Sequence, residues 1–254
     1  MDTLGEKVSR KKRSGFLEID DLLKLMSRQG TVRHFKPDPV PEEKLEKVLQ
    51  AARWAPSGAN AQPWDFIVIK NPKLKGKIVQ IFMDAHQQAK KEDKEFPYIA
   101  DEELRRRFTD PPILIVVCAD TRFMKAYPKV GYREQILNVS MGAAIQNMMS
   151  AANALGLALS WGTVDTLNRD KLQGLLGVPA HIRVLEVLQL GFPAKRVSPR
   201  FRRNLRDFTH VDKFDAKKIQ SEKEIENLLS TRKSPDIYSG VRKPKTKVTR
   251  RENC

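Results

Sequence analysis

The ten residues from Ala55 to Trp64 (APSGANAQPW) form the segment whose residue types are best suited to hold a small molecule. Pro56 and the second proline of this segment restrict the backbone, and Gly58 lets the backbone approach a flat ligand closely. Asn60 and Gln62 offer amide donors and acceptors that match the uracil-like edge of a flavin. The same composition is typical of a tight turn whose polar side chains bind only local backbone, so this segment alone leaves both interpretations open.

A second set of residues is suited to a phosphate group. Arg28, Thr31 and Arg33 lie together upstream of the first segment, and Arg202 with Arg203 lies far downstream. A buried phosphate is held best by several guanidinium groups and a hydroxyl drawn from different parts of the chain. These residues therefore predict a phosphate site, although in a chain with 47 Lys and Arg residues some are expected to be ordinary surface charges, Arg203 above all.

Several common catalytic patterns are missing. The chain has neither GxGxxG nor GxxxxGK[ST], which argues against the classical nucleotide folds. No Ser-His-Asp set, Cys-His pair or close carboxylate dyad stands out, and Cys118 and Cys254 give neither a disulfide framework nor metal-ligand spacing. We therefore predict no metal and no catalytic side chain, a combination that suits an enzyme whose cofactor carries out the redox chemistry.

The elements that must position these residues alternate along the chain. Helical spacing of apolar residues and short β-branched runs predict the following helices and strands. Helices are expected over 17–26, 41–55, 72–90, 102–108, 133–155, 169–176 and 217–229, and strands over 65–70, 112–118, 157–162 and 184–191. The helix over 133–155 is expected to be buried on most sides, and the polar stretch 87–110 is a candidate mobile lid. Four strands interleaved with helices predict an α+β fold, an α/β sandwich whose central sheet is flanked by helices.

The net charge of +16 lies mainly at the two ends of the chain. The first 14 residues carry +3 and residues 194–254 carry +10, which leaves +3 for the middle. A basic stripe for nucleic acid would extend through the middle, so solvated tails are favoured over arms that bind RNA or anionic surfaces. We expect a basic tail over 1–15, one core domain over 16–208, and a basic extension over 209–254 that is partly helical and then disordered or wrapped around a partner. Because no apolar run is long enough for a membrane span, we expect a cytoplasmic protein.

One long stretch resembles a known family. From Ser27 to Pro72 (SRQGTVRHFKPDPVPEEKLEKVLQAARWAPSGANAQPWDFIVIKNP) the chain resembles the opening of the FMN-dependent nitroreductase family. GLALSWGTVD and LGVPAHIRVLEVLQLGFPAK follow in the family's order, and the similarity covers about residues 17–208. The resemblance implies a mostly antiparallel central sheet, an intertwined homodimer, and two FMN sites that each take residues from both subunits.

The resemblance also implies which residues hold the phosphate end of FMN. Thr31 and Arg33 would bind the phosphate and the ribityl chain, and Arg202 would join them from the far end of the core. Many relatives carry two basic residues directly before the Ser or Thr of this motif, whereas Gln29-Gly30 stands there in this chain. Phosphate affinity is then lower, or Arg28 replaces one member of the pair.

The residues implied to border the flavin ring come from two further segments. The first segment, donated across the dimer interface, supplies Pro56, Ser57, Gly58 and, near the polar edge of the ring, Asn60. The second segment supplies Trp161, Gly162 and Thr163, which would lie near the flavin N5. Backbone N–H groups at that position stabilise a reduced flavin anion.

We therefore expect an FMN-dependent oxidoreductase that passes hydride from NADH or NADPH to a small electron-poor acceptor, nitroaromatic or quinone-like, by a ping-pong mechanism. One alternative keeps FMN but dehalogenates an aromatic compound reductively or fragments the flavin. A dehalogenase for amino-acid phenols needs a carboxylate, a tyrosine and a lysine over the ring, and Glu95, Tyr98 and the nearby lysines match that spacing poorly. A third possibility is a flavin- or nucleic-acid-binding protein without turnover, in which the basic tails engage nucleic acid.

Overall fold

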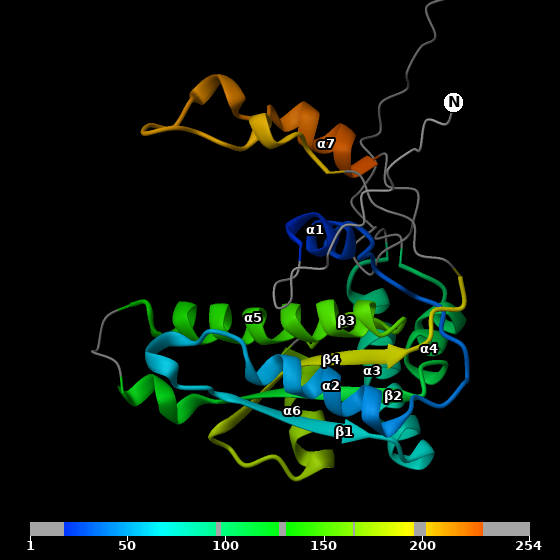
Figure 1. The fold of residues 1–254 in the computed structure, drawn as a ribbon. Coiled ribbons are helices and arrows are strands. Elements are labelled where there is room, and N and C mark those ends of the chain that lie inside the picture. Colours follow the sequence, from blue (N-terminus) through cyan, green and yellow to red (C-terminus); the bar gives the residue numbers. More distant parts are fainter. Residues whose placement is uncertain (1–17, 95–97, 127–130, 165, 196–201, 231–254) are drawn as a thin grey trace, which may run out of the picture.

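A four-stranded sheet with helices on both faces forms the body of the molecule (Figure 1). The computed structural model describes residues 18–94, 98–126, 131–164, 166–195 and 202–230. The strands are β1 (Trp64–Ile69), β2 (Ile113–Asp120), β3 (Ala158–Thr163) and β4 (Ile182–Gly191). Their order is β1-β2-β4-β3, and each neighbouring pair is antiparallel. The predicted α+β class and central antiparallel sheet are confirmed.

The described residues contain fifteen elements, which are the four strands, seven α-helices and four short 3-10 helices. The α-helices are α1 (Ile19–Ser27), α2 (Glu42–Arg53), α3 (Pro72–Glu92), α4 (Asp101–Thr109), α5 (Arg133–Ala154), α6 (Thr166–Leu176) and α7 (Glu222–Ser230). The 3-10 turns are η1 (Gly58–Asn60), η2 (Thr121–Ala126), η3 (Leu205–Asp207) and η4 (Ala216–Lys218). Each helix and strand expected from the sequence is present, with its ends shifted by a few residues.

The central strand β2 explains why helices cover both faces of the sheet. All eight of its residues are buried, and successive side chains of a strand point to opposite faces. Ile115 and Val117 pack into one apolar cluster with α2 and α5, whereas Leu114 and Val116 pack into another with α3, α4 and α6. Each fully buried aliphatic side chain contributes roughly 1.5–3 kcal/mol of transfer free energy, so both clusters stabilise the sheet.

Helix α5 is largely covered, as its composition suggested, but its first half has an open face. One face packs against the sheet and α2, with Met141, Ile145 and Met148 almost completely buried. On the other face Asn138 is exposed, and the side chain of Val139 is 66% exposed. The prediction of burial on most sides therefore holds for much of α5, and the main exception is its first half, around Asn138 and Val139.

The polar stretch 87–110, predicted as a lid, is tied to the body at several points. Helix α3 continues to Glu92, and the Tyr98 hydroxyl donates to the Ala89 carbonyl at 2.9 Å. From outside the stretch, Lys75 Nζ donates to the Thr109 carbonyl at 3.0 Å, and Phe82 stacks on Phe108 with ring centroids 4.2 Å apart. This stretch therefore forms a wall of the molecule, and its mobility stays a prediction.

The two ends of the described chain lie outside the sheet sandwich. Figure 1 shows α1 over the outer side of α5 and α7 farther out. Helix α1 buries none of its residues, and the segment from η3 to α7 exposes large apolar side chains. The predicted tail over 1–15 and the last part of the extension, 231–254, lie outside the described residues. In the part that is described, no helix is long and apolar enough to cross a membrane.

Candidate functional site

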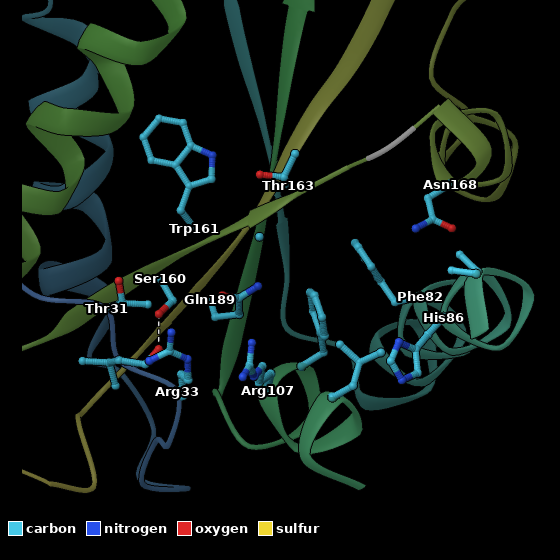
Figure 2. Close-up of a pocket in the computed structure, with 16 residues that line it drawn as sticks. Thr31, Arg33, Phe82, His86, Arg107, Ser160, Trp161, Thr163, Asn168 and Gln189 are labelled. Atoms are coloured by element: carbon cyan, nitrogen blue, oxygen red, sulfur yellow. Dashed lines mark hydrogen bonds between the residues drawn. The ribbon is translucent and has the colours of Figure 1, made fainter. Parts of the chain in front are cut away.

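A cavity of about 280 Å³ opens beside the edge strand β3. Its walls come from β3 and β4, from the arm that follows α1 (residues 31–36), and from helices α3, α4 and α6. Five residues predicted from the sequence to bind the cofactor line it together. These are Thr31, Arg33, Trp161, Gly162 and Thr163. Residues separated by about 130 positions in the sequence therefore converge at one place, as Figure 2 shows.

The arm that carries Thr31 and Arg33 is held across the ends of β3 and β4. Phe35 forms an isolated antiparallel bridge with Pro193, and Lys36 N donates to the Phe192 carbonyl at 2.8 Å. The buried Ser160 hydroxyl donates to the carbonyl of Val32. Because the residues on either side of Arg33 are fixed to the sheet in this way, its guanidinium is directed into the cavity (Figure 2).

Strand β3 offers the cavity a free backbone edge. Within the described part of the chain β3 pairs with β4 alone, so one of its two edges keeps unpaired N–H and C=O groups. Gly162 is required here by the sheet itself, since a Cβ at this position would lie 2.5 Å from Gln189 Nε2 and 2.7 Å from the Val187 carbonyl oxygen. A flat polar ligand can hydrogen-bond to such an edge.

Arg107 is a cavity residue that sequence reasoning missed. Its side chain is about 9% exposed, its Nε lies 3.4 Å from Glu103 Oε1, and it lines the cavity together with Arg33. Figure 2 shows Arg107 between Arg33 and the aromatic wall. In the sequence it is the last of three consecutive arginines, and only its place on the inner face of α4 separates it from the exposed Arg105 and Arg106. Two guanidinium groups in one cavity favour an anionic ligand.

A second missed residue, Glu186, lies beside the predicted flavin-facing strand. Glu186 on β4 is the register partner of Thr163 on β3. Burial raises the pKa of its carboxyl to about 7, against the opposing effects of hydrogen bonds from Trp161 and Thr163 and of the charge of Arg169. Its Oε2 is buried and has no hydrogen-bond partner among the described residues.

Arg28 and Arg202 do not line this cavity. Arg28 is the exposed C-cap of α1 and borders a small depression next to the cavity, where Val32 is common to both. Gln29, the departure from the family pattern, accepts from Gln146 Nε2 at 3.1 Å and donates to Ser150 Oγ at 2.9 Å, so it docks the end of α1 on α5. Arg202 is exposed just after the undescribed residues 196–201.

The loop with Pro56, Ser57, Gly58 and Asn60 lies elsewhere in the chain. Gly58 N donates to Ser140 Oγ on α5 at 3.2 Å, and the Ser57 hydroxyl accepts from the Gln62 backbone N–H at 3.0 Å. Ala59, Asn60 and Gln62 have φ angles of 49°, 52° and 48°. Non-glycine residues in this left-handed region cost roughly 1–2 kcal/mol each, and such strain clusters at functional sites.

The distance between this loop and the arm can be estimated along helix α5, which contacts the loop and the helix before the arm. The loop binds Ser140, whereas α1, which leads into the arm, accepts at Leu25 a hydrogen bond of 2.6 Å from Asn153 Nδ2. Thirteen residues separate Ser140 from Asn153, which corresponds to ~20 Å along a helix that rises 1.5 Å per residue. In one chain the structure therefore brings together the arm and β3, but not the loop.

Comparison with known proteins decides the family. The model of the nitroreductase family matches residues 26–192, which include the arm, the loop and all four strands. The chain belongs to the nitroreductase family. This confirms the prediction of a nitroreductase-like NAD(P)H oxidoreductase at the level of the family.

Relatives of this nitroreductase-family chain differ in their named activities. A putative NADH dehydrogenase/NAD(P)H nitroreductase of Methanothermobacter thermautotrophicus is 30% identical over 80% of this chain and 87% of its own length. Iodotyrosine deiodinase 1 of Rattus norvegicus is 28% identical over 70% of this chain and 64% of its own length, so this chain spans less than two thirds of that enzyme. The NADPH:FMN oxidoreductase of Vibrio harveyi, solved with NAD⁺, is 17% identical, with a TM-score of 0.63 over 82% of each chain, and shows the shared fold.

Proposed function

We propose that this chain is an FMN-dependent oxidoreductase that moves hydride from NADH or NADPH to a small electron-poor acceptor, nitroaromatic or quinone-like, by a ping-pong mechanism. The observation that carries the proposal is the convergence of Thr31, Arg33 and residues 161–163 on one cavity at the free edge of β3. In the same proposal, the second copy of the chain in a homodimer supplies the loop with Pro56, Ser57, Gly58 and Asn60.

The donor set of the cavity fits FMN. Arg33 and Thr31 supply a guanidinium and a hydroxyl for the phosphate and ribityl chain, and Arg107 adds a second positive charge. The free edge of β3 at Trp161, Gly162 and Thr163 supplies backbone groups for a flat heterocycle. When bound, FMN accepts hydride from the nicotinamide and passes it on to the acceptor. The two arginines stabilise the negative charge that this chemistry places near them.

Arg202 and Arg28 complete the proposed phosphate end from outside the cavity. Arg202 is proposed to reach the phosphate once the second subunit is in place, and Arg28 acts as a nearby charge across Val32. Exposed charges of this kind contribute little individually, roughly 0–1 kcal/mol. The main anionic contact is therefore assigned to Arg33.

The rest of the cavity suits an aromatic acceptor. Phe82 and Phe108 stack at 4.2 Å with an interplanar angle of 19°, and Leu104 lies beside them in the same wall. These side chains exclude water and hold a flat apolar ring by area burial. In a ping-pong mechanism the nicotinamide and the acceptor use one pocket in turn, and this apolar wall is the proposed place for both.

Three features support the homodimer. The strained loop lies ~20 Å along α5 from the arm, as derived above. Val139 on the open face of α5 and Trp54 next to the loop are 66% and 77% exposed. The cavity of one chain, about 280 Å³, is just below the roughly 300–1,000 Å³ of complete small-molecule sites. A second copy packed on the open face of α5 would bury the apolar side chains and bring its loop to the cavity.

The proposal is tested by an anaerobic absorption titration of the purified protein with NADH and with NADPH. We expect a bound flavin spectrum that bleaches with at least one nicotinamide and returns when a quinone is added. A protein that binds no flavin after incubation with excess FMN, or a bound flavin that neither nicotinamide reduces, would contradict the proposal.

A second candidate is reductive dehalogenation of a halogenated phenol, and the similarity to iodotyrosine deiodinases favours it. Against it, the Tyr98 hydroxyl donates to the backbone of α3 at 2.9 Å, and Tyr98 does not line the cavity. Glu95 lies outside the described residues. Anaerobic incubation of the reduced protein with 3-iodotyrosine distinguishes the two candidates, since stoichiometric iodide release supports dehalogenation and its absence supports the first proposal.

A further inference from the structure

His86 on α3 belongs to the apolar half of the cavity. Its side chain is 8% exposed, and it lines the cavity together with Phe82, Ala89 and Leu104. Figure 2 shows His86 on the side away from Thr31 and Arg33. A polar, titratable ring in a wall that is otherwise apolar is suited to meet a polar atom of the acceptor.

The surroundings of the ring fix which nitrogen carries hydrogen. His86 Nε2 lies 3.2 Å from the Ile99 carbonyl oxygen and 3.3 Å from Asp101 Oδ1, and both of these groups are acceptors. Asp101 remains a carboxylate at neutral pH because hydrogen bonds from Lys90 and Gln87 lower its pKa. Nε2 therefore keeps its hydrogen in both protonation states of the ring.

The remaining ring nitrogen, Nδ1, makes no hydrogen bond to any described residue. Tyr98 packs edge-on against the ring, with centroids 5.4 Å apart and an interplanar angle of 86°, and so holds its orientation. With Nε2 protonated, Nδ1 is an acceptor in the neutral ring and a donor in the imidazolium ion. Nδ1 is therefore the ring nitrogen that changes between acceptor and donor, and it is the nitrogen left for a ligand in the cavity.

We propose that His86 binds an oxygen of the acceptor through Nδ1 and exchanges a proton with it. This inference rests on the proposed function and narrows its substrate class to aromatic acceptors that carry a carbonyl or phenolic oxygen. Quinone reduction shows the balance. The nicotinamide supplies a hydride through the bound flavin, His86 supplies one proton from Nδ1, and the quinone becomes a hydroquinone while the imidazolium becomes neutral imidazole.

Charged groups face His86 from two sides. Asp101 lies against Nε2, and Lys90 lies on the far side of Asp101. Arg107 and Arg33 line the same cavity. Water restores the proton that His86 gives up after the product leaves.

The first test is binding to the oxidised, FMN-loaded protein. The probes are 4-nitrophenol and its methyl ether, 4-nitroanisole, followed by the visible spectrum. We expect the wild-type protein to prefer the phenol by about tenfold, the ratio that one buried hydrogen bond provides. His86→Phe keeps the aromatic contact with Tyr98 and should lower this preference to within about twofold, whereas His181→Gln, an exposed histidine outside the cavity, should keep it.

The second test is the oxidation of the reduced protein by benzoquinone in stopped flow. We expect the rate of His86→Phe to be about tenfold lower than the wild-type rate at low pH, and only the wild-type rate to fall as pH rises, because only that protein carries the proposed proton donor. Asp101→Asn keeps the phenol preference but reduces the rate, because it removes the carboxylate that lies against Nε2. An unchanged phenol preference and an unchanged pH profile in His86→Phe would overturn the role of His86. Failure to bind FMN, or to be reduced by a nicotinamide, would instead overturn the proposed function.

Discussion

The cavity at β3 and the loop around η1 are both built for a ligand, but in opposite ways. The cavity gathers Arg33 and Arg107 inside walls from six parts of the chain, so its polar groups point inward. The loop holds Asn60 exposed on a strained backbone that is joined to α5 by the hydrogen bond from Gly58 N to Ser140 Oγ. The cavity is closed on several sides, whereas the loop presents groups whose side-chain bonds are local, such as that from Gln62 Nε2 to Asn60 Oδ1 at 3.3 Å. In the proposed function the two regions are two halves of one site, which a second copy of the chain completes.

The largest expected effect comes from a charge on the open face of α5. Val139→Arg should raise the dissociation constant of the dimer by about 1,000-fold or more, because each dimer would bury two unpaired charges. Sedimentation velocity should show a monomer that has lost FMN and keeps its circular dichroism. Gln88→Arg adds the same charge to exposed α3 and should leave the dimer intact. A flavin-loaded Val139→Arg monomer would show that one chain is sufficient.

A smaller effect is expected inside the cavity. Arg33→Ala should weaken FMN binding by roughly 100-fold, since a buried hydrogen bond to a charged group is worth about 1.5–3 kcal/mol. The matched variant Arg28→Ala should change it by no more than about threefold, because Arg28 is exposed. Flavin fluorescence titration measures both constants. Equal effects of the two variants would contradict the assignment of the phosphate to Arg33 in the cavity and not to Arg28 in the depression beside it.

The smallest effect concerns the carboxyl of Glu186 on β4, the strand paired with β3. The pKa of Glu186 is raised to about 7 from an ordinary value of 4.5, so the stability that its neutral form allows is complete below pH 4.5 and is lost as pH rises through 7. We expect wild-type stability to fall by on the order of 1–2 kcal/mol between pH 5 and 8, after allowance for solvent screening. Glu186→Gln should lack this fall in chemical denaturation. The same fall in both proteins would assign it to another group.

Much of the fold was predictable because local patterns and burial agree. The uninterrupted apolar run of β2 predicts a buried strand, and the spacing of apolar residues in α2 predicts a helix with one buried face. The structure has both. The open face of α5 was not predictable, since small apolar residues suit both a core and a subunit interface. Val139 on this face is exposed in the single chain, so this face is not part of the core of that chain.

The site was predictable where a short motif carries it and not where only the folded chain assembles it. Thr31 and Arg33 stand in the family motif and line the cavity. Arg107 was missed because it follows two other arginines, His86 because it lies in a polar helix segment, and Glu186 because it lies in an apolar strand. Each is selected only by the face of the helix or strand on which it lies. No spacing in the sequence indicates that these three residues lie in the wall of one cavity or beside it in the folded chain.

Mixed dimers test most directly whether each site is shared between two chains. Arg33→Ala removes the cavity arginine, and Pro56→Trp fills the space in front of the loop, where Pro56 is exposed in the single chain. A dimer of one chain of each variant should bind one FMN, because one site then takes Arg33 from one chain and Pro56 from the other. A dimer of wild-type chain with the doubly substituted chain should bind none. The reverse pattern, no FMN in the first mixed dimer and one in the second, would contradict the shared site.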